Sequence, residues 1–282
     1  MFLSPAVLML LCLSLIPIGY SLWISFQRYN LAMPASTIRF NGLANYAKLL
    51  SNPQFLDSIV WTLVFAASAV VVETVMGLSI ALLLHSDYSR HFNGVFKTVL
   101  IIPMMVAPVV SATVWKLMFY PVYGVVNCTL EMLGLSAVNW LGETYWAKIA
   151  IIIVEIWMAT PFCVLVFQAA LKTVPVEMVE AARVDGASAG RTLFSITLPT
   201  IRNFLALVVT IRLSDALRAF DAVMQLTNGA PGASTETIGT TIYKIAFRYN
   251  DVGQGSAGAF IFFVVVSIVA LISMKIMRKQ AD

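Results

Sequence analysis

Charged side chains are scarce in this sequence of 282 residues: Asp, Glu, Lys and Arg make up only 11%, whereas 60% of the residues are hydrophobic. An average soluble domain carries about 25% charged residues, and a chain of this length cannot bury so much apolar surface in one core. The low charge therefore excludes an ordinary water-soluble protein and predicts a lipid-embedded one. The net charge of +4 is too small and too scattered to indicate a nucleic-acid partner.

Cysteine and histidine are also rare, with three and two residues. Cys12, Cys128 and Cys163 have no metal-ligand spacing and predict no disulfide framework, so we interpret them as small packing residues. His85 and His91 flank a short polar loop without a third ligand, and no metal site is expected. The phosphate-loop pattern G-x-x-x-x-G-K-[ST] is missing, and no nucleophile–base set stands out. This chain is therefore not expected to hydrolyse ATP, to have catalytic residues or to bind a cofactor.

Six apolar runs are long enough to cross a membrane, because a spanning helix needs roughly 20 mainly apolar residues. They cover about residues 2–26, 58–84, 97–120, 146–170, 201–227 and 255–276. Prolines inside several runs predict kinks, where neighbouring helices can satisfy the freed carbonyls. The first run has no small-residue cleavage site after it, so we interpret it as a retained membrane helix rather than a signal peptide. The sequence predicts an all-α integral membrane protein with one transmembrane domain over residues 1–282.

Six spans place both termini on the same side of the membrane, and basic residues indicate which side this is. The loops and tail on that side carry nine basic residues, against seven in the longer loops opposite; the nine are Arg90, Lys97, Lys172, Arg183, Arg191, Arg202, Lys275, Arg278 and Lys279. The positive-inside rule favours cytoplasmic termini. Aromatic residues near the opposite loops are typical of an interfacial belt; they include Tyr46, Trp61, Trp140 and Trp146.

The segment 171–200, between the fourth and fifth predicted spans, has the pattern of two short helices joined by a glycine. Pro175 suits a first helical turn, since its missing N–H needs no partner there, and Glu177 favours the same positive helix end. Gly186 can adopt the left-handed conformation that ends a helix, and a second helix is expected over about 188–197. From periodicity alone, this segment could be a surface connector without any partner.

The spacing within this loop resembles the signature of permease subunits in binding-protein-dependent ABC importers. That signature is EAA, three residues, Gly, and nine more residues that end near I-x-LP, and here the EAA is followed by Asp185-Gly186 and by Ile196-Thr197-Leu198-Pro199. The resemblance implies a type I ABC importer permease, in which this loop is the coupling helix that docks on an ATPase subunit. The residues to which it assigns this role are Glu180, Ala181, Ala182, Asp185, Gly186 and Leu198.

Motifs along the whole chain are similar to those of maltose-type carbohydrate permeases, specifically the larger partner of the pair. They include Phe220-Asp221, residues 226–231 and Thr235-Glu236-Thr237, although Ala230 replaces the second glycine that usually precedes the proline. The resemblance implies four partners besides membrane lipid: a second permease subunit, two ATPase subunits that hold ATP and Mg, and a periplasmic or extracytoplasmic solute-binding protein. It also implies a multi-pass location in the bacterial plasma (inner) membrane and import of the solute.

The fifth predicted span carries four ionisable residues three positions apart, namely Arg212, Asp215, Arg218 and Asp221, with Ser214 beside them. Residues three apart lie on one broad helix face, so opposite charges alternate along a stripe. This stripe is either a structural ladder of ion pairs or a polar wall where solute binds. In the resembled family this face contributes to the sugar site. The guanidinium of Arg218 suits sulfonate, phosphate or carboxylate groups, so we expect a sugar derivative that could carry an anionic group.

Further substrate candidates lie in the second and fourth predicted spans. Glu73 and Glu155 could face a cavity or pair with the partner permease, and Trp157 and Thr160 lie near Glu155, where a tryptophan face could stack on a sugar. Two other functions stay open. An ion-gradient-driven secondary transporter would use intramembrane carboxylates as coupling groups, but it leaves the EAA loop unexplained. A non-transporting membrane scaffold predicts that the charged stripe is dispensable for uptake.

Overall fold

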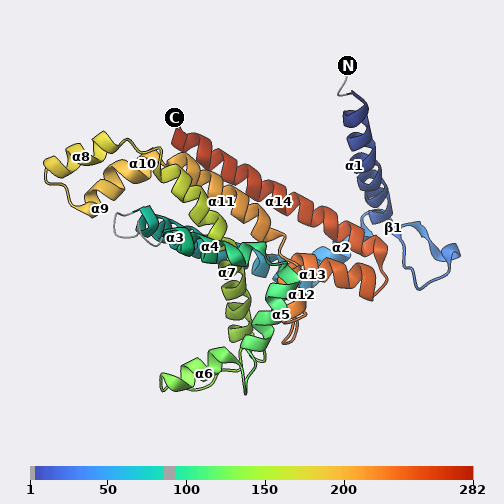
Figure 1. Cartoon of the computed structure of the whole chain (residues 1–282). Coiled ribbons are helices and arrows are strands. Elements are labelled where there is room, and N and C mark those ends of the chain that lie inside the picture. Colours follow the sequence, from blue (N-terminus) through green and yellow to red (C-terminus); the bar gives the residue numbers. More distant parts are fainter. Residues whose placement is uncertain (1–3, 86–92, 282) are drawn as a thin grey trace. The chain divides into compact units, whose positions relative to one another are not determined.

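The computed structural model describes residues 4–85 and 93–281, so Arg90 and His91 lie outside the described residues, as do the first positions of the first predicted span. The chain is 76% helical, which confirms the predicted helical class. Within the described residues, the strands form one short two-stranded ribbon (Figure 1). Contacts divide the chain into two units: unit 1 comprises Met1–Thr62 and Glu236–Ile268, and unit 2 comprises Leu63–Thr235 and Val269–Asp282. Each unit is described separately.

Among the described residues, four unbroken helices are long and apolar enough to cross a membrane. They are α1 (Ser4–Ser25), α3 (Pro53–His85), α7 (Thr144–Leu171) and α14 (Val252–Ala281). Two bent pairs could each form one further span: α4 (Asn93–Met105) with α5 (Pro108–Met118), at 104°, and the segment Ala189–Thr200 with α11 (Arg202–Leu217), at 70°. The third and fifth predicted spans are therefore each divided by a sharp bend, and the described residues hold four unbroken spans, or up to six if each bent pair is one span.

Local backbone chemistry accounts for the break in the third span. Pro108 occupies the first turn of α5, and Ala107 before it has φ −58° and ψ 138°, which is not helical. Proline disfavours the α conformation in the residue that precedes it, and α4 ends at Met105, just before this point. The fifth span is interrupted twice. Ile201 separates α10 (Leu198–Thr200) from α11, and after α11 ends at Leu217 a separate helix, α12 (Asp221–Leu226), begins.

Unit 1 holds the ribbon and the beginnings of α3 and α14. The ribbon pairs β1 (Gln27–Arg28) with β2 (Arg39–Phe40), followed by α2 (Ala44–Leu50), while α13 (Ile238–Tyr243) and a π-helical turn, Lys244–Arg248, precede α14. Its core contains Leu49, Phe55, Ile238, Ile245 and Ala257. The buried Asn45 amide donates to the carbonyl oxygens of Ser25 and Gln27, both at 2.8 Å, which joins the end of α1 to β1.

Unit 2 is built around α7, which packs on α4, α5, α11 and α12. Its core contains buried side chains of α3, α7 and α11, including Ala81, Cys163, Val164, Phe167 and Val208. The backbones of α3 and α7 approach closely at Gly77, where an added Cβ would lie 2.4 Å from the Cβ of Cys163. A short helix, α6 (Val125–Met132), follows α5. The packing of α7 against these helices places the polar side chains of several helices near one another.

The loop after α7 forms two short helices joined by a glycine, as predicted. The helix α8 (Val176–Val184) ends before Gly186, which has φ +76°, the left-handed conformation that glycine adopts without steric cost. The helix α9 (Ala189–Thr192) and the π-helical turn Leu193–Thr197 then lead into α10. Pro175 caps α8 with φ −62° and ψ 127°, so it precedes the first helical turn instead of lying in it.

Candidate functional site

A buried ion-pair cluster joins three helices of unit 2 through one guanidinium. Arg212 of α11 donates from Nε to Oε2 of Glu73 on α3 at 2.8 Å, and from Nη2 to Oε1 of Glu155 on α7 at 2.7 Å. The exposed fractions of the Arg212, Glu73 and Glu155 side chains are 10%, 0% and 9%. Buried charges are costly unless they are paired and hydrogen-bonded. Arg212 therefore holds α3, α7 and α11 together and neutralises charge that would otherwise be isolated.

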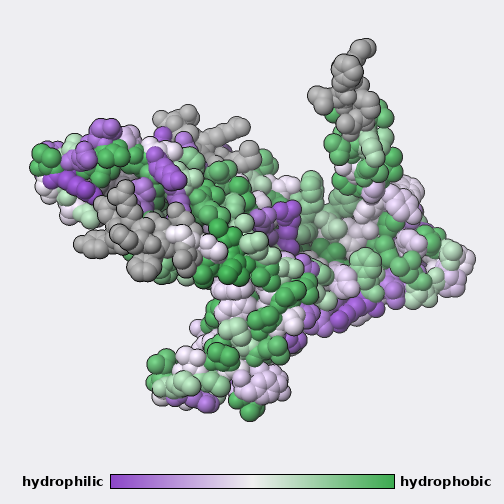
Figure 2. All heavy atoms as spheres, in the orientation of Figure 1, coloured by the Kyte–Doolittle hydropathy of each residue, from purple (hydrophilic) through white to green (hydrophobic). Residues whose placement is uncertain are grey.

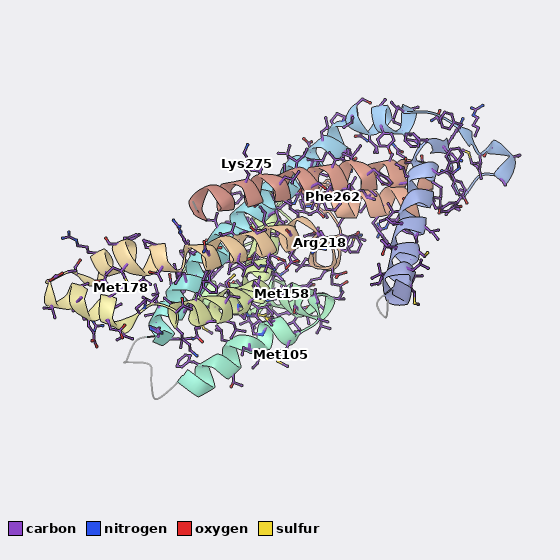
Figure 3. All side chains as sticks on the ribbon, turned by 90° about the horizontal axis from the view of Figure 1, so that it is seen from above. Met105, Met158, Met178, Arg218, Phe262 and Lys275 are labelled. Atoms are coloured by element: carbon purple, nitrogen blue, oxygen red, sulfur yellow. The ribbon has the colours of Figure 1, made fainter. Side chains whose placement is uncertain are left out.

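The cluster continues along α11 toward exposed side chains. Nη1 of Arg212 lies 3.4 Å from Oδ2 of Asp215, whose Oδ1 accepts a hydrogen bond from Nη2 of Arg218 at 2.9 Å. Nε of Arg218 also donates to the carbonyl oxygen of Ser214 at 3.0 Å, which satisfies a carbonyl in the last turn of α11. Figure 3 labels Arg218 at this helix end. The side chains of Asp215 and Arg218 are 45% and 64% exposed, so this end of the cluster is open to solvent.

The two arginines therefore have different chemical capacities. Arg212 directs all three guanidinium nitrogens at carboxylates and uses four of its five N–H donors on them, so it has little capacity left for a solute. Arg218 is mostly exposed, and its guanidinium can still donate to an anionic or hydroxyl group. Asp215 bridges the two, so the buried pairs hold Asp215 and, through it, Arg218 in a defined position. The ion-pair ladder thus describes the buried part of the stripe, whereas a role of the exposed part in solute binding stays a prediction.

The structure places the other predicted substrate residues unequally. Asp221 is exposed and begins α12, beyond the end of α11, so the prediction that it shares a helix face with the other three charges is wrong. The Ser214 hydroxyl donates to the Thr210 carbonyl at 2.9 Å, and the Thr160 hydroxyl donates to the Ile156 carbonyl at 2.6 Å. Such bonds within a helix engage both hydroxyls as donors but leave their oxygens able to accept.

The ion pair between Glu73 and Arg212 was not predicted from the sequence. A signal for this pairing exists: a carboxylate within an apolar run of α3 requires a cation from another helix. The sequence offers Arg212 at one such position, but the register between α3 and α11 is not visible in the sequence. The partner of Glu73 therefore emerges only from the packing of the helices.

Aromatic rings form a continuous row in unit 2. Trp157 on α7 contacts Trp115 on α5 edge to face, with ring centroids 5.8 Å apart, and Trp115 contacts Phe119 at 5.2 Å. The row continues to Trp140 at 5.1 Å and to Trp146 at 5.2 Å. Trp115 thus packs between Trp157 and Phe119 and is half-buried. Trp157 is half-buried, so part of its ring remains accessible.

The α8–α9 segment presents its predicted coupling residues on the surface. Glu180, Ala181, Asp185 and Gly186 are exposed and Ala182 is half-buried, while Leu198 packs against the core of unit 2. Large apolar side chains are also exposed here, namely Val176, Met178, Val184 and Phe194. Hydrophobic and hydrophilic atoms lie side by side over this hairpin in Figure 2, and Met178 is labelled on α8 in Figure 3. Exposed apolar patches rimmed by polar residues mark protein-interaction surfaces.

The chain is similar to known transport proteins both in sequence and in fold. A family model described as "Binding-protein-dependent transport system inner membrane component" matches residues 73–282. The chain is 37% identical to the trehalose/maltose transport system permease protein MalF of Thermococcus litoralis, over 99% of this chain and 92% of that protein. It is 33% identical to the trehalose transport system permease protein SugA of Mycobacterium tuberculosis, over 100% and 89%. The fold is similar to that of a chain in a bacterial alginate ABC transporter crystallised with an alginate pentasaccharide-bound periplasmic protein (TM-score 0.85, 24% identity, coverage of 99% and 93%).

Proposed function

The chain belongs to the family of binding-protein-dependent transport system inner membrane components, and from this premise we propose that it is the permease subunit of an ATP-driven importer for a carbohydrate or sugar derivative. The observation that carries the proposal is the exposed α8–α9 hairpin with its EAA–Gly spacing, which has no role in a chain that does not bind an ATPase subunit in the cytoplasm. The sugar class is supported by the names of the relatives, two of which transport trehalose. The chain spans most of the length of both relatives.

The partners follow from what this chain lacks and what it exposes. A second permease completes the translocation path, and two ATPase subunits bind ATP and Mg and receive the α8–α9 hairpins. Val176, Met178 and Val184 supply apolar contact to an ATPase subunit, and Glu180 and Asp185 supply charge at the rim. A solute-binding protein delivers the sugar from outside the plasma (inner) membrane. The basic residues counted above support an orientation with both termini in the cytoplasm.

The mechanism couples movement of the hairpin to the packed helices. Gly186 ends α8 without strain, and Leu198 packs into the same core as Phe167 and Val208, so displacement of the hairpin reaches α7 and α11 through continuous packing. ATP binding and the loaded binding protein each shift the helices only by the preference they have for one state. The buried pairs of Arg212 keep α3, α7 and α11 moving as one body.

The solute-facing part of the site is the exposed end of the charge cluster. Arg218 and Asp215 offer donors and acceptors to sugar hydroxyls, and Arg218 also suits an anionic substituent. Trp157 offers a half-buried ring for stacking, with Thr160 and Ser214 as further polar positions on α7 and α11. Glu155 and Arg212 act behind this surface by positioning Asp215. ATP hydrolysis and any cofactor are assigned to the partner subunits.

Two other functions fit the structure less well. A secondary transporter needs intramembrane carboxylates that bind and release a coupling ion, whereas Glu73 and Glu155 are each bound at 2.7–2.8 Å by Arg212. A scaffold that moves no solute gives no role to the exposed Arg218–Asp215 end. Uptake that persists with a catalytically dead ATPase subunit, or that collapses with an uncoupler at constant ATP, would favour the secondary transporter.

The deciding experiment reconstitutes the chain with its second permease, ATPase subunits and solute-binding protein, and measures ATPase activity and uptake over a panel of neutral and acidic sugars. We expect stimulation by one sugar, and loss of stimulation by an acidic sugar in Arg218→Gln. Arg248→Gln is the matched control, because Arg248 is also exposed but lies in unit 1. A neutral sugar that is transported equally by Arg218→Gln would make Arg218 structural. No stimulation by any sugar would refute the carbohydrate assignment.

A further inference from the structure

A polar pocket of about 440 Å³ lies in unit 1, where the chain leaves α1 and forms the ribbon. Three cationic side chains line it, those of Arg28, Arg39 and Lys48, together with the single carboxylate of Asp251. Their formal charges sum to +2, since three positive charges face one negative charge. The predicted sugar path and the α8–α9 hairpin are built from unit 2, so this pocket requires a separate explanation.

The two arginines form an arrangement that is unfavourable without a ligand. Arg28 and Arg39 are directly opposite each other across the antiparallel ribbon, so their side chains leave it on the same face. Like charges directly opposite in a sheet destabilise it. In the part of the chain that the structure describes, neither arginine forms an ion pair with a carboxylate. An anion bound between them would remove this repulsion.

The one carboxylate of the pocket is already engaged. Oδ1 of Asp251 accepts from the backbone N–H of Gln254, which caps the first turn of α14. Nζ of Lys48 lies 3.4 Å from Oε1 of Gln254, a neutral partner. The pocket thus keeps an excess of positive charge that its own acceptors do not neutralise.

Hydrogen bonds between side chains and the backbone hold the walls of the pocket. The side-chain amide of Asn45 donates to the carbonyl oxygens of Ser25 and Gln27. Oδ1 of Asn30 accepts from the N–H of Ala32 at 2.8 Å. Asn30 also pairs with Asp251 in an isolated β-bridge, which ties the ribbon to the residue before α14. The cations therefore project from a fixed frame, so that binding does not require this part of the backbone to become ordered.

The position in the chain indicates the source of the anion. Arg28 lies three residues after Ser25, the last residue of the apolar helix α1, so the pocket lies at the depth where lipid headgroups replace acyl chains. Trp23 and Phe40 beside it are 57% and 67% exposed, with ring centroids 6.3 Å apart, and tryptophan concentrates at this interface. We propose that the pocket formed by Arg28, Arg39 and Lys48 binds the phosphate group of an anionic phospholipid. The acyl chains would then lie along the exposed apolar surface of α1.

Lipid retention by the purified full chain in detergent tests this proposal, with phosphatidylglycerol and phosphatidylcholine as probes and native mass spectrometry as the readout. We expect preferential retention of phosphatidylglycerol, which weakens as salt rises. Arg28→Gln/Arg39→Gln should lower the affinity for phosphatidylglycerol by roughly thirtyfold, since each basic residue near an anionic surface contributes about fivefold and the two contributions multiply. Arg248→Gln, an exposed arginine of unit 1 outside the pocket, is the matched control and should retain the lipid.

Each alternative gives a different result. Equal retention of the two lipids by the unaltered chain overturns the proposal, even if the double variant fails to fold. Loss of lipid from the control as well as from the double variant also overturns it, since general surface charge would then explain the retention. Inorganic phosphate that binds while phosphatidylglycerol does not would assign the pocket to a free anion. If the double variant retained lipid normally but lost stimulation by the solute-binding protein, the pocket would be a contact for acidic residues of that protein.

Discussion

Replacement of Arg212 by glutamine tests the role of the buried charge cluster most directly. Two carboxylates depend on this guanidinium, at 2.8 Å and 2.7 Å, and their side chains are 0% and 9% exposed. Loss of one partner from a buried ion pair typically costs about 3–5 kcal/mol, because the remaining charge has neither water nor a counter-ion. Arg212→Gln breaks two such contacts on the same centre, so we expect a decrease in the free energy of unfolding at or above the upper end of this range.

Arg218→Gln is the matched control, since it removes the same charge from the same helix. The Arg218 side chain is 64% exposed and its ion pair with Asp215 faces solvent, and exposed pairs contribute only about 0.2–1 kcal/mol. The two arginine variants should therefore differ by at least about 2 kcal/mol in the free energy of unfolding. Reversible unfolding in mixed micelles, followed by tryptophan fluorescence, gives the comparison.

A compensating variant separates pairing from packing. When Arg212, Glu73 and Glu155 are all replaced by leucine, no charge is left unpaired, and such apolar replacements of buried ionic groups are often neutral or stabilising. We expect the triple variant to be much more stable than Arg212→Gln alone. If Arg212→Gln and Arg218→Gln lowered stability equally, or if the triple variant were the least stable of all, the buried cluster would not be what holds α3, α7 and α11 together.

Three further changes test other parts of the fold. Gly77→Ala should lower the free energy of unfolding by about 1–3 kcal/mol through overpacking against Cys163. Addition of Cys163→Gly should restore part of the lost stability. If Gly77→Ala left the stability unchanged, the close approach of α3 and α7 would be contradicted. Gly186→Ala places a Cβ on a backbone with φ +76°, at a cost of about 1–2 kcal/mol. We expect the ATPase activity that the solute-binding protein stimulates to fall as a result. Unchanged stimulation would mean that the end of α8 does not matter for coupling. Lys244→Met removes the cation that pairs with the buried carboxylate of Glu236 and should lower the free energy of unfolding by about 3–5 kcal/mol. A decrease of less than about 1 kcal/mol, measured by chemical denaturation, would refute a buried pair.

Local features of the sequence were sufficient to predict several parts of this protein. Long apolar runs predict spanning helices because lipid forces every backbone group to be satisfied within its own segment, and α1, α3, α7 and α14 follow that pattern closely. Gly186 between two helical stretches likewise predicts the α8–α9 hairpin, since a left-handed residue there is a local requirement. The EAA spacing identified the family because its motif residues lie within one short segment.

The packing of distant segments decided the remaining features. Pro108 signals a break, but a proline can kink a membrane helix or divide it, and neighbouring helices determine which occurs. The periodicity of the charges in 212–221 assumed one helix, whereas α11 ends at Leu217 and removes Asp221 from the stripe. The pairing of Glu73 with Arg212 and the opposition of Arg28 and Arg39 join residues whose relative register no local pattern encodes. The sequence thus determined which segments are helical and that a buried charge needs a partner. Only tertiary packing determined which partner is within reach, because the energy of an ion pair depends on the distance between the charges in space and not on their separation in the sequence.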